Sequence, residues 1–191
     1  MASIVGQIVA EEESAEPRDE RALVESAKQD SAALAELYRQ NYSAIAGYVH
    51  RRVRDRDEAK DIVSDVFLEM VRGIKRYRHR GVPFRFWLYR LASAQLSRWA
   101  RRRHRWAMKQ LREIVDSQAN DDSERPLVRE TMEIVLSSLP HRLQTAIVLH
   151  YVEGMSVADV AKVTECPIGT VKSRLSEGRS LMRERLNKRG F

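Results

Sequence analysis

Apolar positions recur every three to four residues through most of this chain, a spacing that predicts amphipathic helices. Over 19–50 the pattern indicates two helices that meet at Asp30 and Ser31, either of which is suited to cap the second helix. A third helix is expected over 57–74, and a fourth begins near Phe84 after a loop marked by glycine and proline. Further helices are predicted over 127–139 and 140–154. We therefore expect an all-α fold.

The segment 153–186 predicts two helices joined by a short turn. Ser156 is suited to cap the first helix, and Pro167 is suited to the first position of the second. The second helix is expected to bury Ile168, Val171 and Leu175 and to present hydroxyl and cationic groups on its other side. Such a helix suits insertion into a DNA major groove, with the preceding helix across the backbone. The pattern alone fits equally well a helical hairpin packed inside an all-α protein.

Charge is distributed unevenly along the chain. Residues 71–110 hold thirteen Lys and Arg and no acid, whereas residues 1–20 hold six acids and one base. A basic block of this kind is typical of nucleic-acid binding, because a solvated helix face usually mixes both signs. We expect residues 1–18 to form an acidic flexible tail.

Aromatic side chains are interleaved with arginines in and around the basic block, and this combination suits an unpaired strand. Arginine neutralises phosphate, and aromatic faces stack on bases. The alternative is that Trp87, Leu88, Leu91 and Leu96 belong to the core, although this does not account for the arginines. The aromatic candidates are Phe84, Phe86, Trp87, Tyr89, Trp99 and Trp106.

Several classes of function are disfavoured. The sequence contains no glycine-rich phosphate loop, no metal-ligand spacing and no convincing nucleophile–base pair, so we expect neither an enzyme nor a cofactor or metal. Its one cysteine, Cys166, excludes an internal disulfide. We see no membrane-spanning stretch and no secretory signal, and we expect the protein in the cytoplasm.

Three motifs resemble one family, in the family's order. The string CPIGTVKSRL resembles the promoter-reading C-terminal domain of bacterial sigma-70 family RNA polymerase sigma factors, in particular the extracytoplasmic-function (ECF) group. The helix carrying Asp61, Asp65 and Phe67 resembles the one that grips the clamp helices of RNA polymerase. FRFWLYRLA resembles the promoter-melting segment, with Ala94 and Arg98 where the family commonly has asparagine and an acid.

The resemblance implies two small helical domains: a region 2-like domain over 19–106 and a region 4-like domain over 127–191. A flexible acidic linker, 107–126, would join them. The implied partners are core RNA polymerase (clamp helices and flap), promoter DNA and an anti-sigma factor, without membrane insertion. The alternative is a two-domain helix-turn-helix regulator that acts on duplex DNA without polymerase.

The resemblance also assigns residues to three surfaces. The polymerase-binding candidates are Asp57, Asp61, Asp65, Phe67 and Glu69. The candidates for the −10 element are Arg78, Arg80, Arg85, Trp87, Arg90, Arg98, Arg101 and Arg102. The candidates for the −35 element are Pro167, Gly169, Thr170, Lys172, Ser173, Arg174, Ser176, Glu177 and Arg179.

Overall fold

A computed structural model describes residues 17–79, 81–113 and 128–189, and over these ranges the chain forms helices and no strands. The all-α prediction is therefore confirmed. The elements are α2 (Pro17–Ser26), α3 (Ser31–His50), α4 (Arg56–Gly73), the 3-10 turn η1 (Ile74–Arg76), α5 (Phe84–Glu113), α6 (Val128–Ser138), α7 (His141–Ile147), the π turn η2 (Val148–Val152), α8 (Val157–Thr164) and α9 (Ile168–Asn187). The predicted acidic tail, apart from 17–18, lies outside the described residues.

The predicted linker falls only partly within the described chain. Helix α5 continues past residue 106 to Glu113, so the first residues of the predicted linker are helical. The remainder, 114–126, lies outside the described residues.

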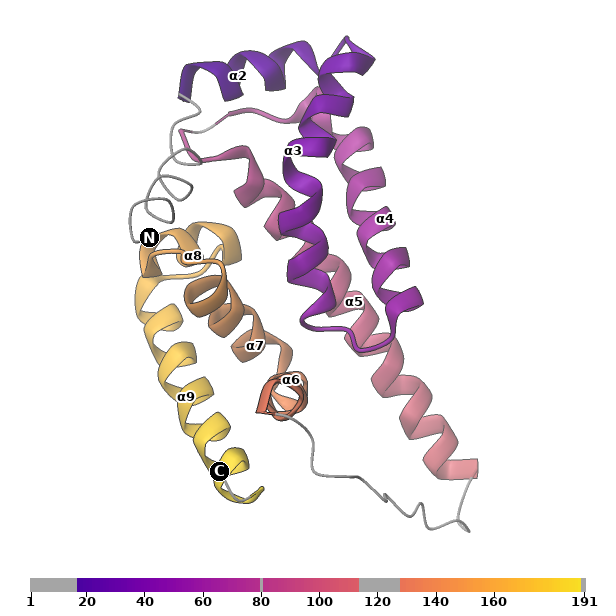
Figure 1. Ribbon diagram of the computed structural model, residues 1–191, viewed down its shortest axis with the longest axis vertical. Coiled ribbons are helices and arrows are strands. Elements are labelled where there is room, and N and C mark those ends of the chain that lie inside the picture. The colour runs from indigo at the N-terminus through magenta and orange to yellow at the C-terminus, as the bar shows by residue number, and fades with distance from the viewer. Residues whose placement is uncertain (1–16, 80, 114–127, 190–191) are drawn as a thin grey trace, which may run out of the picture.

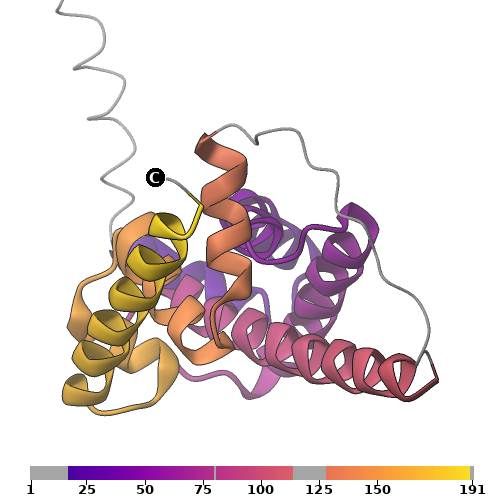
Figure 2. The same cartoon turned by 90° about the horizontal axis from the view of Figure 1, so that it is seen from below.

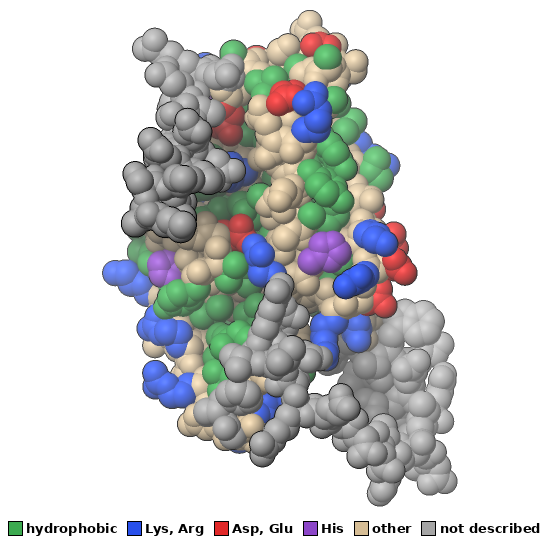
Figure 3. Space-filling view, viewed as in Figure 1, with side chains coloured by type: hydrophobic (Ala, Val, Ile, Leu, Met, Phe, Trp, Pro, Cys, Tyr) green, Lys and Arg blue, Asp and Glu red, His purple; other side chains and the backbone are tan. Residues whose placement is uncertain are grey.

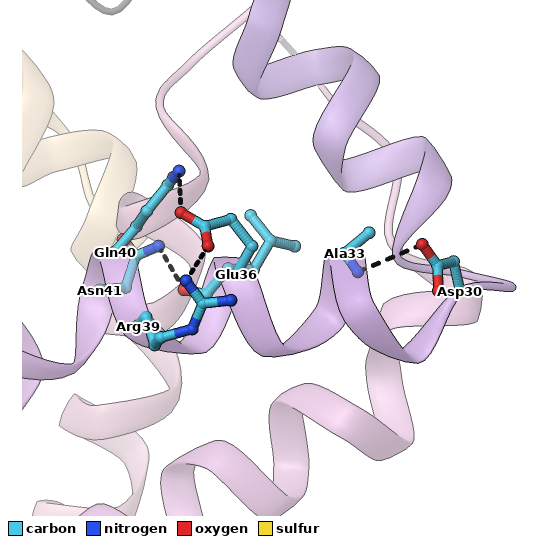
Figure 4. A network of polar contacts seen from close by, with 7 residues as sticks. Asp30, Ala33, Glu36, Arg39, Gln40 and Asn41 are labelled. Carbon is cyan, nitrogen blue, oxygen red and sulfur yellow. Dashed lines mark hydrogen bonds and ion pairs between the residues drawn. The ribbon is translucent and has the colours of Figure 1, made fainter.

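The start of α3 shows how local signals set the helix boundaries. Asp30 is the N-cap, and its carboxylate accepts hydrogen bonds from the backbone N–H groups of Ala32 (2.9 Å) and Ala33 (3.3 Å). One turn further along, Glu36 accepts from Gln40 at 3.0 Å and pairs with Arg39 (Figure 4). Of the two capping candidates in the sequence, the structure uses the aspartate, because a carboxylate satisfies two free N–H groups at the positive end of the helix.

Helices α3, α4 and α5 pack against one another, and α2 crosses one end of α3; we call α2–α5 the N-terminal bundle (Figure 1). The core consists of the apolar stripes that the sequence predicts, with a spacing of three to four residues. Its fully buried members include Leu37, Ile45, Tyr48, Val66, Met70, Phe84, Leu88 and Leu96.

Helices α6–α9 form the C-terminal bundle, in which α7 packs closely along α9 (Figure 1). The closest approach is at Gly178, where a Cβ atom would lie 2.9 Å from Cγ1 of Ile147. Val171 and Leu175 continue the same buried seam. Glycine is required at this position because a side chain would force the two helices apart.

One prediction of burial is wrong. Ile168 is 49% exposed: it is the first residue of α9, whose N-cap is Pro167, and the buried positions of α9 start only at Val171. Tyr38 and Tyr42 of α3 are likewise partly accessible, at 40% and 42% exposed. They stand at the edge of the bundle, where their rings pack on Phe67.

The two bundles lie against each other. Helix α5 contacts both α7 and α8 (Figures 1 and 2). One connected cluster of buried side chains extends through both bundles. Among the described residues, no helix combines the length and the apolar character that spanning a membrane would need.

We predict that Leu175→Ala lowers the free energy of unfolding by roughly 2–5 kcal/mol, because it leaves a cavity in the α7–α9 seam. Ile168→Ala, on the exposed side of the same helix, serves as the matched control and should stay within about 0.5 kcal/mol of wild type. Urea unfolding followed by circular dichroism measures both. Equal losses would contradict the burial of this seam.

Candidate nucleic-acid interface

Helices α8 and α9 are joined by a compact turn. Ser156 caps α8 as predicted: its hydroxyl accepts from the N–H of Asp159 at 3.1 Å and donates to the Asp159 carboxylate at 2.7 Å. At the other end Glu165 adopts a left-handed conformation, with φ of 50°, and the N–H of Cys166 reaches back to the carbonyl of Ala161 at 3.2 Å. This turn sets α9 at a fixed angle to α8, as a helix-turn-helix unit requires.

The side of α9 that faces away from α7 and α8, which we call the outer face of α9, presents most of the predicted −35 positions. Figure 3 shows Lys and Arg side chains along this helix. Thr170 and Arg174 are half-buried at its margin. The exposed positions are Pro167, Gly169, Lys172, Ser173, Ser176, Glu177 and Arg179.

Contacts within the bundle hold several of these side chains. Arg179 donates to the hydroxyl of Tyr151 at 2.7 Å, and Arg174 approaches the sulfur of Cys166 at 3.5 Å. Glu177 pairs with Arg142 of α7 at 3.5 Å. The sequence indicated neither Arg142 nor Tyr151, because both belong to another part of the chain and no local spacing links them to α9.

A cavity of about 350 Å³ opens beside the start of α5, and we call it the aromatic pocket. The ring of Tyr77 lies 4.8 Å from that of Trp87 and 5.2 Å from that of Phe84, centroid to centroid. Burial, followed by the carboxylate of Glu20, raises the pKa of the Tyr77 hydroxyl, so this group remains a donor at neutral pH. The lining is aromatic on one side and cationic at the rim: Arg76, Tyr77, Arg78, Val82, Phe86, Trp87, Arg90 and Lys162.

The structure corrects the assignment of aromatic residues. Phe84, Phe86 and Tyr89 are buried, since α5 turns them towards its neighbours, and of the three only Phe86 borders the aromatic pocket. Trp87 and Trp99 are half-buried and keep part of their faces accessible, whereas the side chain of Trp106 lies outside those described. Tyr77, which the aromatic candidates did not include, lies beside Trp87.

The predicted strand-binding arginines fall into two groups. Arg78, Arg85, Arg101 and Arg102 are exposed and form no ion pair with the described carboxylates. Arg98 pairs with Glu69 of α4 at 2.6 Å, and Arg90 pairs with Glu165 at 2.7 Å. Arg80 lies outside the described residues. The exposed group is therefore available to phosphate, while the paired group must first release a carboxylate.

Helix α4 presents the predicted acidic surface, visible at the edge of the molecule in Figure 3. Asp57, Asp61 and Asp65 are exposed, and Asp57 pairs with Lys60 at 3.1 Å. Phe67 is only 5% exposed, so it supports this surface from below. Leu68 on the same helix is 50% exposed, an apolar group that the predicted set did not include.

The acidic surface of α4 adjoins the arginines of α5 across a cavity of about 400 Å³, the α4–α5 cavity. Asp61 and Asp65 line one side, and Trp99 and Arg102 line the other. Arg103 crosses it: it pairs with Glu58 at 3.3 Å, and its guanidinium carbon lies 5.6 Å from the Trp99 ring centroid. Two predicted surfaces of opposite charge thus meet along one helix pair.

Comparison with known proteins agrees with this arrangement. The family model for sigma-70 region 2 matches residues 37–106, and the model for sigma-70 region 4 matches residues 132–182. An RNA polymerase sigma-H factor of Pseudomonas aeruginosa is 32% identical over 148 residues, covering 71% of this chain and 76% of that protein. The chain belongs to the sigma-70 family of RNA polymerase sigma factors.

A further relative supports the same family, and a solved structure shares the fold. An ECF RNA polymerase sigma-E factor of Haemophilus influenzae is 29% identical over 188 residues, covering 90% of this chain and 97% of that protein, which places the sigma factor in the ECF group. The sigma factor RpoE of Bartonella quintana, solved in complex with the anti-sigma factor NepR, shares the fold with a TM-score of 0.63 and 23% identity, covering 80% of this chain and 96% of that chain. Sigma factors direct the initiation of transcription, and membership of the family assigns this function to the chain.

We predict that Arg102→Ala lowers the slope of log affinity for single-stranded DNA against log salt concentration by about 0.7, the contribution of one released counterion. Arg103→Ala is the matched control on the same helix and should change the slope less, because Glu58 and Trp99 already hold that side chain. Fluorescence anisotropy over a salt series measures both slopes. Identical slopes for the two variants would show that the ion pair with Glu58 does not keep Arg103 from binding phosphate.

Proposed function

We propose that this sigma factor divides its work among three surfaces. The acidic surface of α4 docks on core RNA polymerase, and the aromatic pocket with the neighbouring arginines captures the unpaired non-template strand of the −10 region. The outer face of α9 reads the −35 element in the major groove. The chain itself performs no catalysis; it lends promoter recognition to the polymerase.

The aromatic pocket carries this proposal. An aromatic-lined cavity with a cationic rim suits an unpaired base, whose face stacks while its phosphate is neutralised. A regulator that binds only duplex DNA would have no use for such a cavity. The pocket therefore favours strand capture over the alternative of a duplex-binding regulator.

On α9, contacts divide between bases and backbone. Lys172, Ser173 and Ser176 form an exposed row in the position from which a recognition helix reaches base edges. Glu177, oriented by Arg142, is suited to accept from the amino group of a cytosine. Arg174 and Arg179 lie towards the margin and contribute to phosphate binding, and hence to affinity more than to specificity.

On α4, exposed carboxylates and an exposed apolar side chain form one docking surface. Asp61 and Asp65 offer acceptors for cationic groups of the clamp helices, and Leu68 adds apolar area next to them. A surface that combines charge with an apolar anchor is typical of a specific protein interface. We further propose that an anti-sigma factor binds this chain, as one does the Bartonella quintana relative, and that it acts in the cytoplasm with the polymerase.

Transcription in vitro with purified core polymerase and a promoter library tests the division between specificity and affinity. Lys172→Ala should change which −35 sequences are used, because it removes a base-reading group. Arg101→Ala should weaken all promoters alike and reduce the salt slope by about one phosphate contact. Uniform loss for both variants would contradict the division, and no transcription from any promoter with the folded wild-type chain would overturn the proposed function.

A second prediction concerns the polymerase surface. The double change Asp61→Asn and Asp65→Asn should weaken binding to core polymerase at least roughly tenfold, because charge pairs across an interface lose their partners. Glu36→Gln, a half-buried acid on α3 that pairs with Arg39, is the control and should leave affinity unchanged. Biolayer interferometry with immobilised core enzyme measures both, and unchanged affinity of the double variant would remove α4 from the docking surface.

A further inference from the structure

Tyr77 and Trp87 form the ring pair of the aromatic pocket, and both are only half-buried. Their ring centroids lie 4.8 Å apart, with 40° between the ring planes. A half-buried ring is packed on one side only, so its orientation depends on the few residues behind it. Two residues that do not line the pocket, Gly73 and Glu20, contribute to this support.

Gly73, the last residue of α4, lies against the indole of Trp87. A Cβ atom on Gly73 would lie 3.0 Å from Cζ2 of Trp87 and 3.3 Å from Cη2. Carbon atoms in favourable contact lie about 3.5–4.0 Å apart, so the indole occupies space that a side chain would need. The backbone of Gly73 is right-handed helical, with φ of −96° and ψ of −20°. Glycine is therefore needed here for the indole and not for the course of the chain.

Glu20 of α2 holds the beginning of α5. Its carboxylate accepts from the backbone N–H of Phe84, the first residue of α5, at 3.1 Å. The N–H groups of a first helical turn have no partner within the helix, and the helix dipole favours a carboxylate there. Phe84 is fully buried, and its ring lies 5.2 Å from that of Tyr77 and 5.4 Å from that of Trp87. Glu20 thus anchors the residue on which both rings of the pocket pack.

The charge of Glu20 also acts on Tyr77. Burial, followed by this carboxylate, raises the pKa of the Tyr77 hydroxyl, and Arg90 opposes the shift. Glu20 therefore lies close enough to influence both the start of the helix that carries Trp87 and the ring beside it.

We infer that Gly73 and Glu20 are positioning residues for strand capture: they set the spacing and tilt of the Tyr77–Trp87 ring pair without contacting the strand. This inference rests on the strand capture proposed above. It adds that the shape of the aromatic pocket depends on α2 and on the end of α4, two helices that supply none of the described residues lining it.

Gly73→Ala tests the support behind the indole. The chain is assembled with core polymerase and titrated with a fluorescent single-stranded oligonucleotide that carries a −10 sequence selected from the promoter library. The variant should bind about fivefold more weakly, the lower end of what overpacking costs, because the added methyl group displaces the indole. The variant should stay folded, since alanine favours a helical backbone more than glycine does, and circular dichroism checks this.

A double-mutant cycle shows whether the effect passes through Trp87. Phenylalanine is shorter than tryptophan and relieves the contact at Cζ2 and Cη2. In the Trp87→Phe background, Gly73→Ala should therefore change the affinity by less than about twofold. Gly47→Ala is the matched control: it changes another helical glycine, on α3, where the nearest neighbour of the added Cβ would be the flexible guanidinium of Arg51 at 3.4 Å. It should leave the affinity unchanged.

Glu20→Ala and Glu20→Gln test the support at the start of α5. Alanine removes the acceptor for the N–H of Phe84 and should weaken strand binding roughly threefold. Glutamine keeps an oxygen that can accept from this N–H, and it should hold the affinity within about twofold of wild type.

A spectroscopic measurement reports on the indole itself. The chain is labelled with 5-fluorotryptophan, and the fluorine resonance of Trp87 is identified by its loss in Trp87→Phe. This resonance should move in Gly73→Ala and in Glu20→Ala, because both changes alter the surroundings of the indole. It should stay in place in Gly47→Ala.

Three results would overturn the inference: wild-type affinity in Gly73→Ala, a loss of the same size in the Trp87→Phe background, or Glu20→Gln binding no better than Glu20→Ala. The proposed function is read separately, from Trp87→Ala in the same assay. That variant should bind at least about tenfold more weakly, because it removes a stacking surface. Normal binding by Trp87→Ala would count against strand capture at this pocket, whatever the two positioning residues do.

Discussion

The N-terminal half of α5 is buried against α3 and α4, and this contact determines what the rest of the helix presents. Phe84, Leu88, Ala92 and Leu96 point inward and are at most 1% exposed. Because the side chains of a helix point in set directions around its axis, burial of this side determines which residues lie on the opposite side. The aromatic pocket, the exposed arginines and the residues that meet α7 and α8 therefore all depend on one packing arrangement.

Acidic side chains of α4 and basic side chains of α5 lie next to each other and not on separate sides of the molecule. Arg98 and Arg103 of α5 reach across to Glu69 and Glu58 of α4. These exposed pairs contribute little to stability. They make these arginines less available to phosphate, because a cation paired with a carboxylate binds phosphate less readily. The large positive charge of 71–110 is thus partly neutralised by the acidic helix beside it.

The sequence was sufficient where structure is determined locally. Helix limits followed from caps such as Asp30 and Ser156, and the exposed row on α9 followed from helical spacing. It was insufficient where contacts with residues distant in the sequence determine burial and pairing. Around Phe86 and Tyr89 nearly every side of the helix carries a large side chain, so spacing could not indicate which would be buried. No local spacing indicated that Arg52 donates to Gln144 and Thr145 of α7. The left-handed conformation of Glu165 could not be predicted, because the residue at this position is neither glycine nor asparagine.

The absence of a side chain at Gly178 has a consequence for how this protein can diverge. Since α7 and α9 meet there almost backbone to side chain, the angle of α9, the proposed recognition helix, is set by a buried position and not by its outer face. Substitutions on the outer face can accumulate without tilting the helix. A lineage could in this way acquire new target genes by replacing surface residues, while the frame that carries them stays constant.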